Sequence, residues 1–167
     1  MRRAGQTDAD GWVPDQSTSI EISGVVFTDG TYEGSPYLAA VMKAEMVGSK
    51  AQLRRMLPLV QASWESTDTT GEEMLTRLKE SVWLLGEDID PAQLKELKGQ
   101  FPTLNEDERK NLANFARFGL NKVKSTFLKD MNALGKAGRP LSRSSVREWL
   151  SKTRDDCERW LSALEDQ

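Results

Sequence analysis

The sequence predicts a mainly α fold, a bundle of about five to six helices preceded by a single N-terminal β-hairpin. Beyond Ser35 the apolar residues recur at spacings of three and four, the period of a half-buried helix. Alternating residues and a hairpin-turn signal occur only before that point. A chain of 167 residues, 38% hydrophobic, buries one moderate core. We therefore expect a flexible arm at 1–17 and one domain at 18–167, with the hairpin at 18–34 and the bundle at 35–167.

The hairpin is predicted from Asp29-Gly30, a dipeptide typical of two-residue turns between strands. Pairing across such a turn sets Phe27 opposite Tyr32. The return strand is short because Gly34 follows so soon. The strand from Ile20 to Val25 is therefore expected to keep an edge that a helix, the N-terminal arm or another chain must cover.

Helix starts are predicted from capping residues. In chain order these are Ser35 before Pro36, Ser49 with Gln52, Thr70 with Glu73, Asp90 before Pro91, Thr103 with Glu106, and Ser142. Apolar spacing continues through Gly48, so the first two helices can equally be one bent helix. Short connections favour antiparallel neighbours. The last helix is expected to bury a seam that includes Cys157 and Trp160.

Composition excludes several chemistries. The chain has no histidine and one cysteine, so zinc sites built from Cys and His and His-based nucleophile systems are excluded. The acidic groups stand where helices begin, which is typical of capping. We therefore expect no enzymatic activity, no metal and no cofactor. No apolar run approaches the roughly 20 residues of a membrane helix, and no signal peptide is evident. A cytoplasmic protein is expected.

Charge is unevenly distributed along the chain. The net charge is -3, yet residues 109–154 hold 12 Lys and Arg against two acids. Such asymmetry favours an anionic partner. The alternative is that acidic and basic helices neutralise each other within the bundle.

The helix predicted to start near Thr103 carries a mixed aromatic and basic stripe. At about 100° per residue, the buried face is predicted to hold Leu112, Ala116, Leu120, Val123, Phe127, Met131 and Leu134. Phe115 and Phe118 fall well off that face, on the stripe that holds Lys122, Lys129 and Lys136. Three interpretations remain open: a protein-binding patch, a single-stranded nucleic-acid surface, or core packing against a neighbouring helix.

The segment from Gly135 to Arg154 is a second basic candidate. Its chemistry resembles that of a helix-turn-helix, but its connection is longer than that motif allows. A helical hairpin is favoured instead, with Arg139 and Arg143 exposed to solvent.

We conclude from the sequence that the chain is a non-enzymatic protein-protein interaction or adaptor module. The predicted partner-binding residues are Ile20, Ile22, Phe115, Phe118, Lys122 and Lys129. The partner would be another protein, or a copy of this chain bound through the hairpin edge. The alternative is a nucleic-acid-binding protein that uses the basic region 109–154. Its phosphate-binding residues would be Lys122, Lys124, Lys129, Arg139, Arg143 and Arg147.

Overall fold

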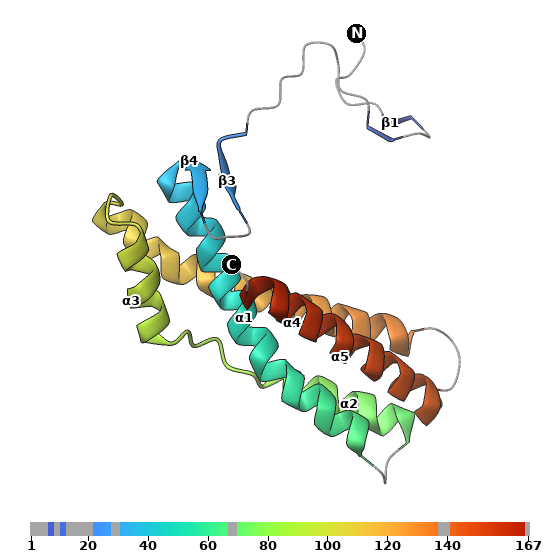
Figure 1. Cartoon of the computed structure of the whole chain (residues 1–167). Coiled ribbons are helices and arrows are strands. Elements are labelled where there is room, and N and C mark those ends of the chain that lie inside the picture. The colour runs from blue at the N-terminus through green and yellow to red at the C-terminus, as the bar shows by residue number, and fades with distance from the viewer. Residues whose placement is uncertain are drawn as a thin grey trace.

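The computed structural model describes residues 7–8, 11–12, 22–27, 31–66, 70–136 and 141–165. Within these ranges the chain forms five helices: α1 (Pro36–Glu65), α2 (Gly71–Trp83), α3 (Pro91–Gln100), α4 (Glu106–Gly135) and α5 (Arg143–Glu165) (Figure 1). An antiparallel β-hairpin precedes them. The predicted fold class is confirmed. None of these helices combines the length and the apolar character needed to cross a membrane.

The strands form two small antiparallel pairs. β3 (Gly24–Val26) pairs with β4 (Tyr32–Gly34), which is the predicted hairpin. β1 (Thr7–Asp8) pairs with β2 (Gly11–Trp12) inside the segment 1–17, which was predicted to be a flexible arm. The short length of both strands explains why no alternating pattern indicated them.

The register of the β3–β4 hairpin differs from the predicted one. Val26 is opposite Tyr32, and the Phe27 amide donates to the Thr31 carbonyl over 2.8 Å. Val26, not Phe27, is therefore opposite Tyr32, so the register is shifted by one residue from the predicted one. A shift of one residue turns a side chain to the other face of the sheet. Tyr32 instead contacts Phe101, with ring centroids 5.4 Å apart.

The strand predicted from Ile20 to Val25 is too long. β3 begins at Gly24, and Ile22 precedes it with its side chain 75% exposed. Ile20 lies outside the described residues, as does the predicted Asp29-Gly30 turn. The unpaired edge is correspondingly shorter than the sequence indicated. β3 and β4 both lie against the N-terminal part of α1.

Helix α1 is one continuous helix, so the two-helix interpretation is wrong and the single-helix alternative is correct. It begins at the predicted cap, where the Leu38 amide donates to the Ser35 hydroxyl, and it continues through Pro58. Ser49 does not cap a second helix. Its buried hydroxyl donates to the Gly119 carbonyl over 3.3 Å. Gly48 is buried there because α4 crosses α1 at this point.

Most of the other helix starts are as predicted. Thr70 and Glu73 form a reciprocal capping box, and the Thr70 amide lowers the pKa of the Glu73 carboxyl by donating to it. Asp90 caps α3, and Ser142 accepts from the Ser145 amide at the start of α5. Thr103 does not cap α4; Asn105 does, in a capping box with Glu108. Both residues carry suitable side chains, so local pattern alone misplaced this boundary by two residues.

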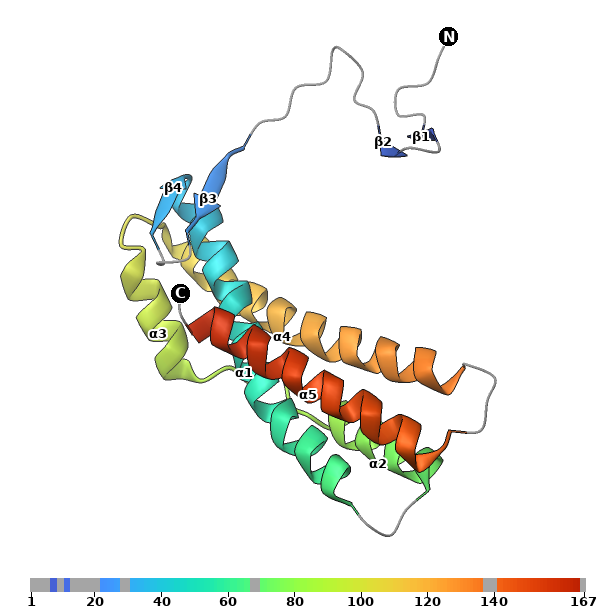
Figure 2. The ribbon, with the colours of Figure 1, turned by 45° about the vertical axis from the view of Figure 1, so that its right-hand side comes forward.

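The core is built mainly from α1 and α4, which run in the same direction and cross (Figure 2). Their first halves share one buried cluster that includes Ala40 and Leu112. Their second halves share another with α2 and α5, which includes Met56 and Phe127. The predicted buried face of α4 is confirmed, although Leu134 is only partly buried. Trp160 is 42% exposed, so its predicted core position is wrong.

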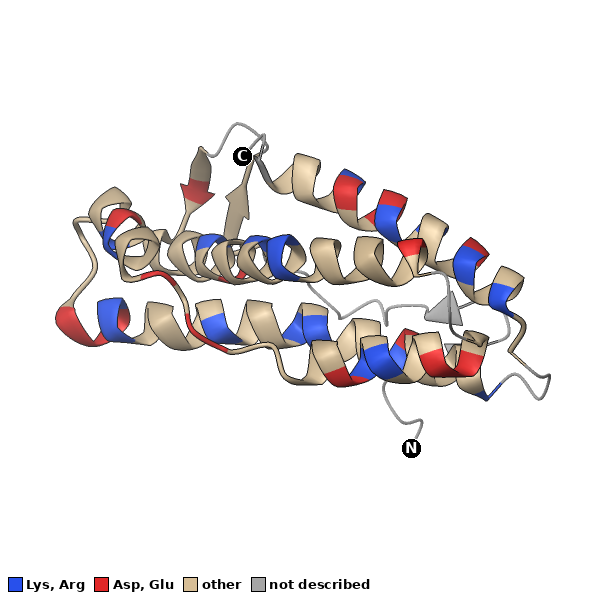
Figure 3. Cartoon of the chain, turned by 90° about the horizontal axis from the view of Figure 1, so that it is seen from below, with Lys and Arg blue, Asp and Glu red and all other residues tan. Residues whose placement is uncertain are grey.

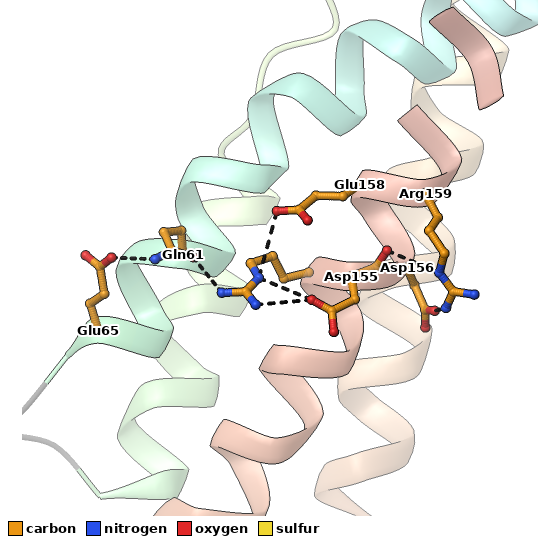
Figure 4. A network of polar contacts seen from close by, with 7 residues as sticks. Gln61, Glu65, Asp155, Asp156, Glu158 and Arg159 are labelled. Atoms are coloured by element: carbon orange, nitrogen blue, oxygen red, sulfur yellow. Dashed lines mark hydrogen bonds and ion pairs between the residues drawn. The ribbon is translucent and has the colours of Figure 1, made fainter. Parts of the chain in front are cut away.

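Helix α5 is joined to α1 by a polar network (Figure 4). Arg154 donates to the Gln61 side chain over 3.4 Å and forms ion pairs with Asp155 and Glu158 of its own helix. Its guanidinium also lies 5.7 Å from the Trp64 ring centroid. This network fixes the side chain of Arg154 against the second half of α1.

Candidate interaction surface

The structure separates the two phenylalanines that the sequence placed on one stripe of α4. Phe115 is partly buried in the first core cluster, where it meets Tyr37 edge to face with ring centroids 6.5 Å apart. Phe118 is 55% exposed. The core interpretation therefore holds for Phe115, and only Phe118 presents a large aromatic surface to solvent.

Two exposed apolar side chains of α1 flank the same side of the helix pair. Leu38 and Met42 lie on the α1 stripe that also holds Glu45, at spacings of four and three. The Glu45 carboxylate forms an ion pair with Lys122, one turn beyond Phe118, over 4.0 Å. This ion pair connects the α1 stripe that holds Leu38 and Met42 to the α4 stripe that holds Phe118 and Lys122. We call Leu38, Met42, Phe118 and Lys122 the Phe118 surface.

The hairpin borders this surface. A side-chain β-carbon placed on Gly24 would lie 3.6 Å from that of Leu38, so β3 lies directly against α1 there. The exposed Ile22 is two residues away along the chain. The predicted hairpin region therefore lies beside the α1 stripe that the Glu45–Lys122 ion pair joins to α4. Lys129, the remaining predicted contact, is exposed two turns further along α4 than Lys122.

Several cations of the basic region bind carbonyl groups at the ends of other helices. The Lys124 ammonium donates to the Trp83 and Leu85 carbonyls, over 2.7 and 2.9 Å. Arg147 donates twice to the Trp64 carbonyl, over 2.9 and 3.1 Å. Arg143 donates to the Ser66 carbonyl over 2.8 Å, so it is not the solvent-exposed side chain that we expected.

These contacts explain part of the charge asymmetry. Carbonyls at a helix C-terminus lack partners within the helix and carry partial negative charge. The C-terminal ends of α1 and α2 therefore attract cations of α4 and α5. Arg55 of α1 likewise donates to the Gly86 and Asp88 carbonyls, which follow α2. Figure 3 shows Lys and Arg interspersed with Asp and Glu along the helices. Such partners cannot be read from sequence, because the carbonyls carry no side-chain signature.

The six predicted phosphate-binding residues therefore fall into three groups. Lys122 and Lys129 are exposed, Lys124, Arg143 and Arg147 bind carbonyls, and Arg139 lies outside the described residues. Among the described residues, no three acidic or sulfur side chains gather as a metal site would require. Asp90 and Glu108 take the capping roles expected of the acids.

Cys157 lies in a cleft of about 330 Å³ between α4 and α5, beside Phe127 and Trp149. No Cα atoms of α4 and α5 lie within 8 Å of each other over their described lengths. The two helices are bridged by side chains instead, with the Phe127 and Trp149 ring centroids 5.6 Å apart. Burial, then the charges of Asp156 and Glu158, raise the pKa of the Cys157 thiol from 9.0 to about 11.

The raised pKa predicts a loss of stability at high pH. An unfolded chain releases the thiol proton near pH 9.0, whereas the folded chain holds it until about pH 11. Stability therefore falls as pH rises between these values. We expect urea unfolding at about pH 8 and about pH 10 to show a larger loss for the wild type than for Cys157→Ala. Equal losses in both chains would contradict this assignment.

Comparison with protein-family models, curated proteins and solved structures finds no match for this chain.

Proposed function

We propose that the chain is a non-enzymatic protein-interaction module that binds a protein partner through the Phe118 surface. The observation that carries this proposal is the 55% exposure of Phe118 one turn from Lys122, whose ion pair with Glu45 joins this stripe of α4 to the α1 stripe of Leu38 and Met42. A large aromatic ring with a polar rim is the usual composition of an interface hot spot. A cytoplasmic location is part of the proposal, because one unpaired cysteine suits a reducing compartment.

Phe118 also suits this role energetically. Its exposed ring contributes little to the folded core, so its position is not explained by packing. By contrast, the neighbouring helix face is well filled, with Ala116 and Leu120 fully buried. Burying the ring of Phe118 and the side chains of Leu38 and Met42 in an interface would remove their apolar surface from water, at about 25 cal/mol per Å².

Site-specific photocrosslinking tests the proposal. A photoreactive phenylalanine analogue at position 118 is compared with one at position 76, where the exposed Thr76 lies on α2, which packs against the second halves of α1 and α4 and so away from Phe118. Exposed to extract from the source cells, the position-118 probe is expected to capture one discrete protein. The double variant Leu38→Ala, Met42→Ala should reduce that capture by at least about tenfold, because hot-spot side chains each contribute more than about 1 kcal/mol.

Phe118→Ala supplies the folding control. Because the ring is exposed, its removal should change the free energy of unfolding by less than about 0.5 kcal/mol. Equal capture at positions 118 and 76, or capture unaffected by the double variant, would contradict the proposal. Oligonucleotide binding that weakens steeply with salt and is lost in Lys122→Glu would favour the nucleic-acid alternative instead. A dimer mass in light scattering, lost in Phe118→Ala, would identify the partner as a second copy.

A further inference from the structure

A groove of about 280 Å³ lies between α1 and α3, on the side of α1 away from the Phe118 surface. Val26 of β3 and Leu164 of α5 complete its lining. At about 100° per residue, the α1 residues of the groove and those of the Phe118 surface fall on opposite flanks of the helix. The two sites can therefore be altered independently.

Three cations of α1 line this groove. Lys43, Lys50 and Arg54 recur at spacings of seven and four, which places them on one stripe of the helix. Glu96 of α3 is the carboxylate among the described lining residues, whose formal charges sum to +2. Arg54 is already engaged in an interaction within the protein, so Lys43 and Lys50 are the cations that a ligand would meet. The whole chain, in contrast, has a net charge of -3. Like charges that lie near one another on one helical stripe repel each other.

The groove also offers apolar walls and neutral donors. Val47 lies between the cations on the same stripe, and Leu97 faces it from α3. The amide side chains of Gln93 and Gln100 complete the α3 wall. Lys43 and Lys50 are half-buried, and the Lys43 ammonium lies 6.0 Å from the Phe101 ring centroid. Charged groups held beside apolar walls bind anions more strongly than fully solvated ones.

We infer that the α1–α3 groove binds a compact organic phosphate monoester. Such a group carries about -1.5 to -2 charges at neutral pH, which matches the two half-buried ammonium groups of Lys43 and Lys50. Its oxygens would be held by Lys43 and Lys50, and its organic part would lie against Val47 and Leu97. The volume is near the lower limit for ligand pockets, about 300 Å³, so the ligand is small.

Isothermal titration of the full chain with phenyl phosphate tests this inference. Inorganic phosphate and benzyl alcohol serve as half-ligands that carry only the anion or only the ring. We expect phenyl phosphate to bind more tightly than either and to weaken at least about tenfold in Lys50→Gln, because charge-assisted contacts contribute about 1.5 kcal/mol or more. Binding should also weaken below about pH 6, where the phosphate gains a proton.

Lys129→Gln is the matched control, since it removes one exposed lysine outside the groove. Lys50→Arg keeps the positive charge and is expected to retain binding, which separates loss of contact from loss of folding. No heat with phenyl phosphate would overturn the inference. Equal weakening in Lys129→Gln would also overturn it, because binding would then follow total charge. So would equal affinity for inorganic phosphate, because the apolar wall would then contribute nothing.

Discussion

Replacing Gly48 with alanine is expected to destabilise the protein by about 3 kcal/mol or more, at or beyond the upper end of the usual cost of overpacking. An alanine β-carbon at this position would lie 1.7 Å from the Ala116 carbonyl oxygen and 2.9 Å from the Leu120 amide nitrogen. Both obstacles are backbone atoms of α4. They cannot rotate away as a flexible side chain would, so the two helices would have to separate.

Gly119→Ala tests the same crossing from the other helix. Its β-carbon would lie 2.0 Å from the Glu45 carbonyl oxygen of α1. Separating the helices would also break the contact between Ser49 and the Gly119 carbonyl and open both core clusters. We therefore expect a loss as large as that of Gly48→Ala. Chemical denaturation followed by circular dichroism measures both variants.

Gly99→Ala is the matched control, because a β-carbon added to Gly99 in α3 would meet no packing neighbour within 4 Å. Alanine is favoured over glycine inside a helix by about 1 kcal/mol. Stability should therefore rise slightly or stay unchanged. If Gly48→Ala and Gly119→Ala behaved like Gly99→Ala, the close crossing of α1 and α4 would be refuted.

Replacing Gln52 with methionine is expected to stabilise the protein by about 1–3 kcal/mol, the cost of leaving a buried polar group unpaired. Gln52 is 0% exposed, and neither its amide nitrogen nor its carbonyl oxygen has a hydrogen-bond partner within the described part of the chain. Methionine has a similar shape and removes both polar atoms. The midpoint of urea unfolding should move upward, with the slope unchanged.

Gln100→Met, at an exposed position of α3, is the control and should leave stability unchanged within about 0.5 kcal/mol. A lower stability for Gln52→Met would show that the buried amide is satisfied, for instance by an ordered water molecule. The two cases give opposite results. If the amide has partners, substitution removes its hydrogen bonds and lowers the free energy of unfolding. If it has none, substitution removes an unpaired polar group and raises that free energy.

The sequence predicted those features of the fold that depend on neighbours along the chain. Capping at Ser35, Thr70 and Asp90 was correct, because each cap bonds an amide two or three residues away. The buried face of α4 was also correct, because helical periodicity fixes which side chains share a face. Phe118 and Lys122 were selected for the same reason.

Features that depend on a distant segment were missed. Gly48 indicated a helix end, whereas its role is to admit the backbone of α4. The sequence could not distinguish Phe115 from Phe118. In the structure Tyr37 of α1 packs against Phe115, whereas Phe118 is exposed. The sequence did not indicate that the cations of the α1–α3 groove form a site. The residues of α3 that form the opposite wall of the groove are about 40 residues away along the chain.

The sequence by itself therefore determined the helical segments, most of their starting residues and the buried face of α4. Tertiary structure alone decided that α1 and α4 run parallel and cross at two glycines, and that Lys124, Arg143 and Arg147 bind helix-end carbonyls rather than solvent. The physical reason is the distance along the chain over which each interaction acts. Capping and periodicity act within one or two helical turns, whereas backbone approach and carbonyl partners depend on atoms that only folding brings together.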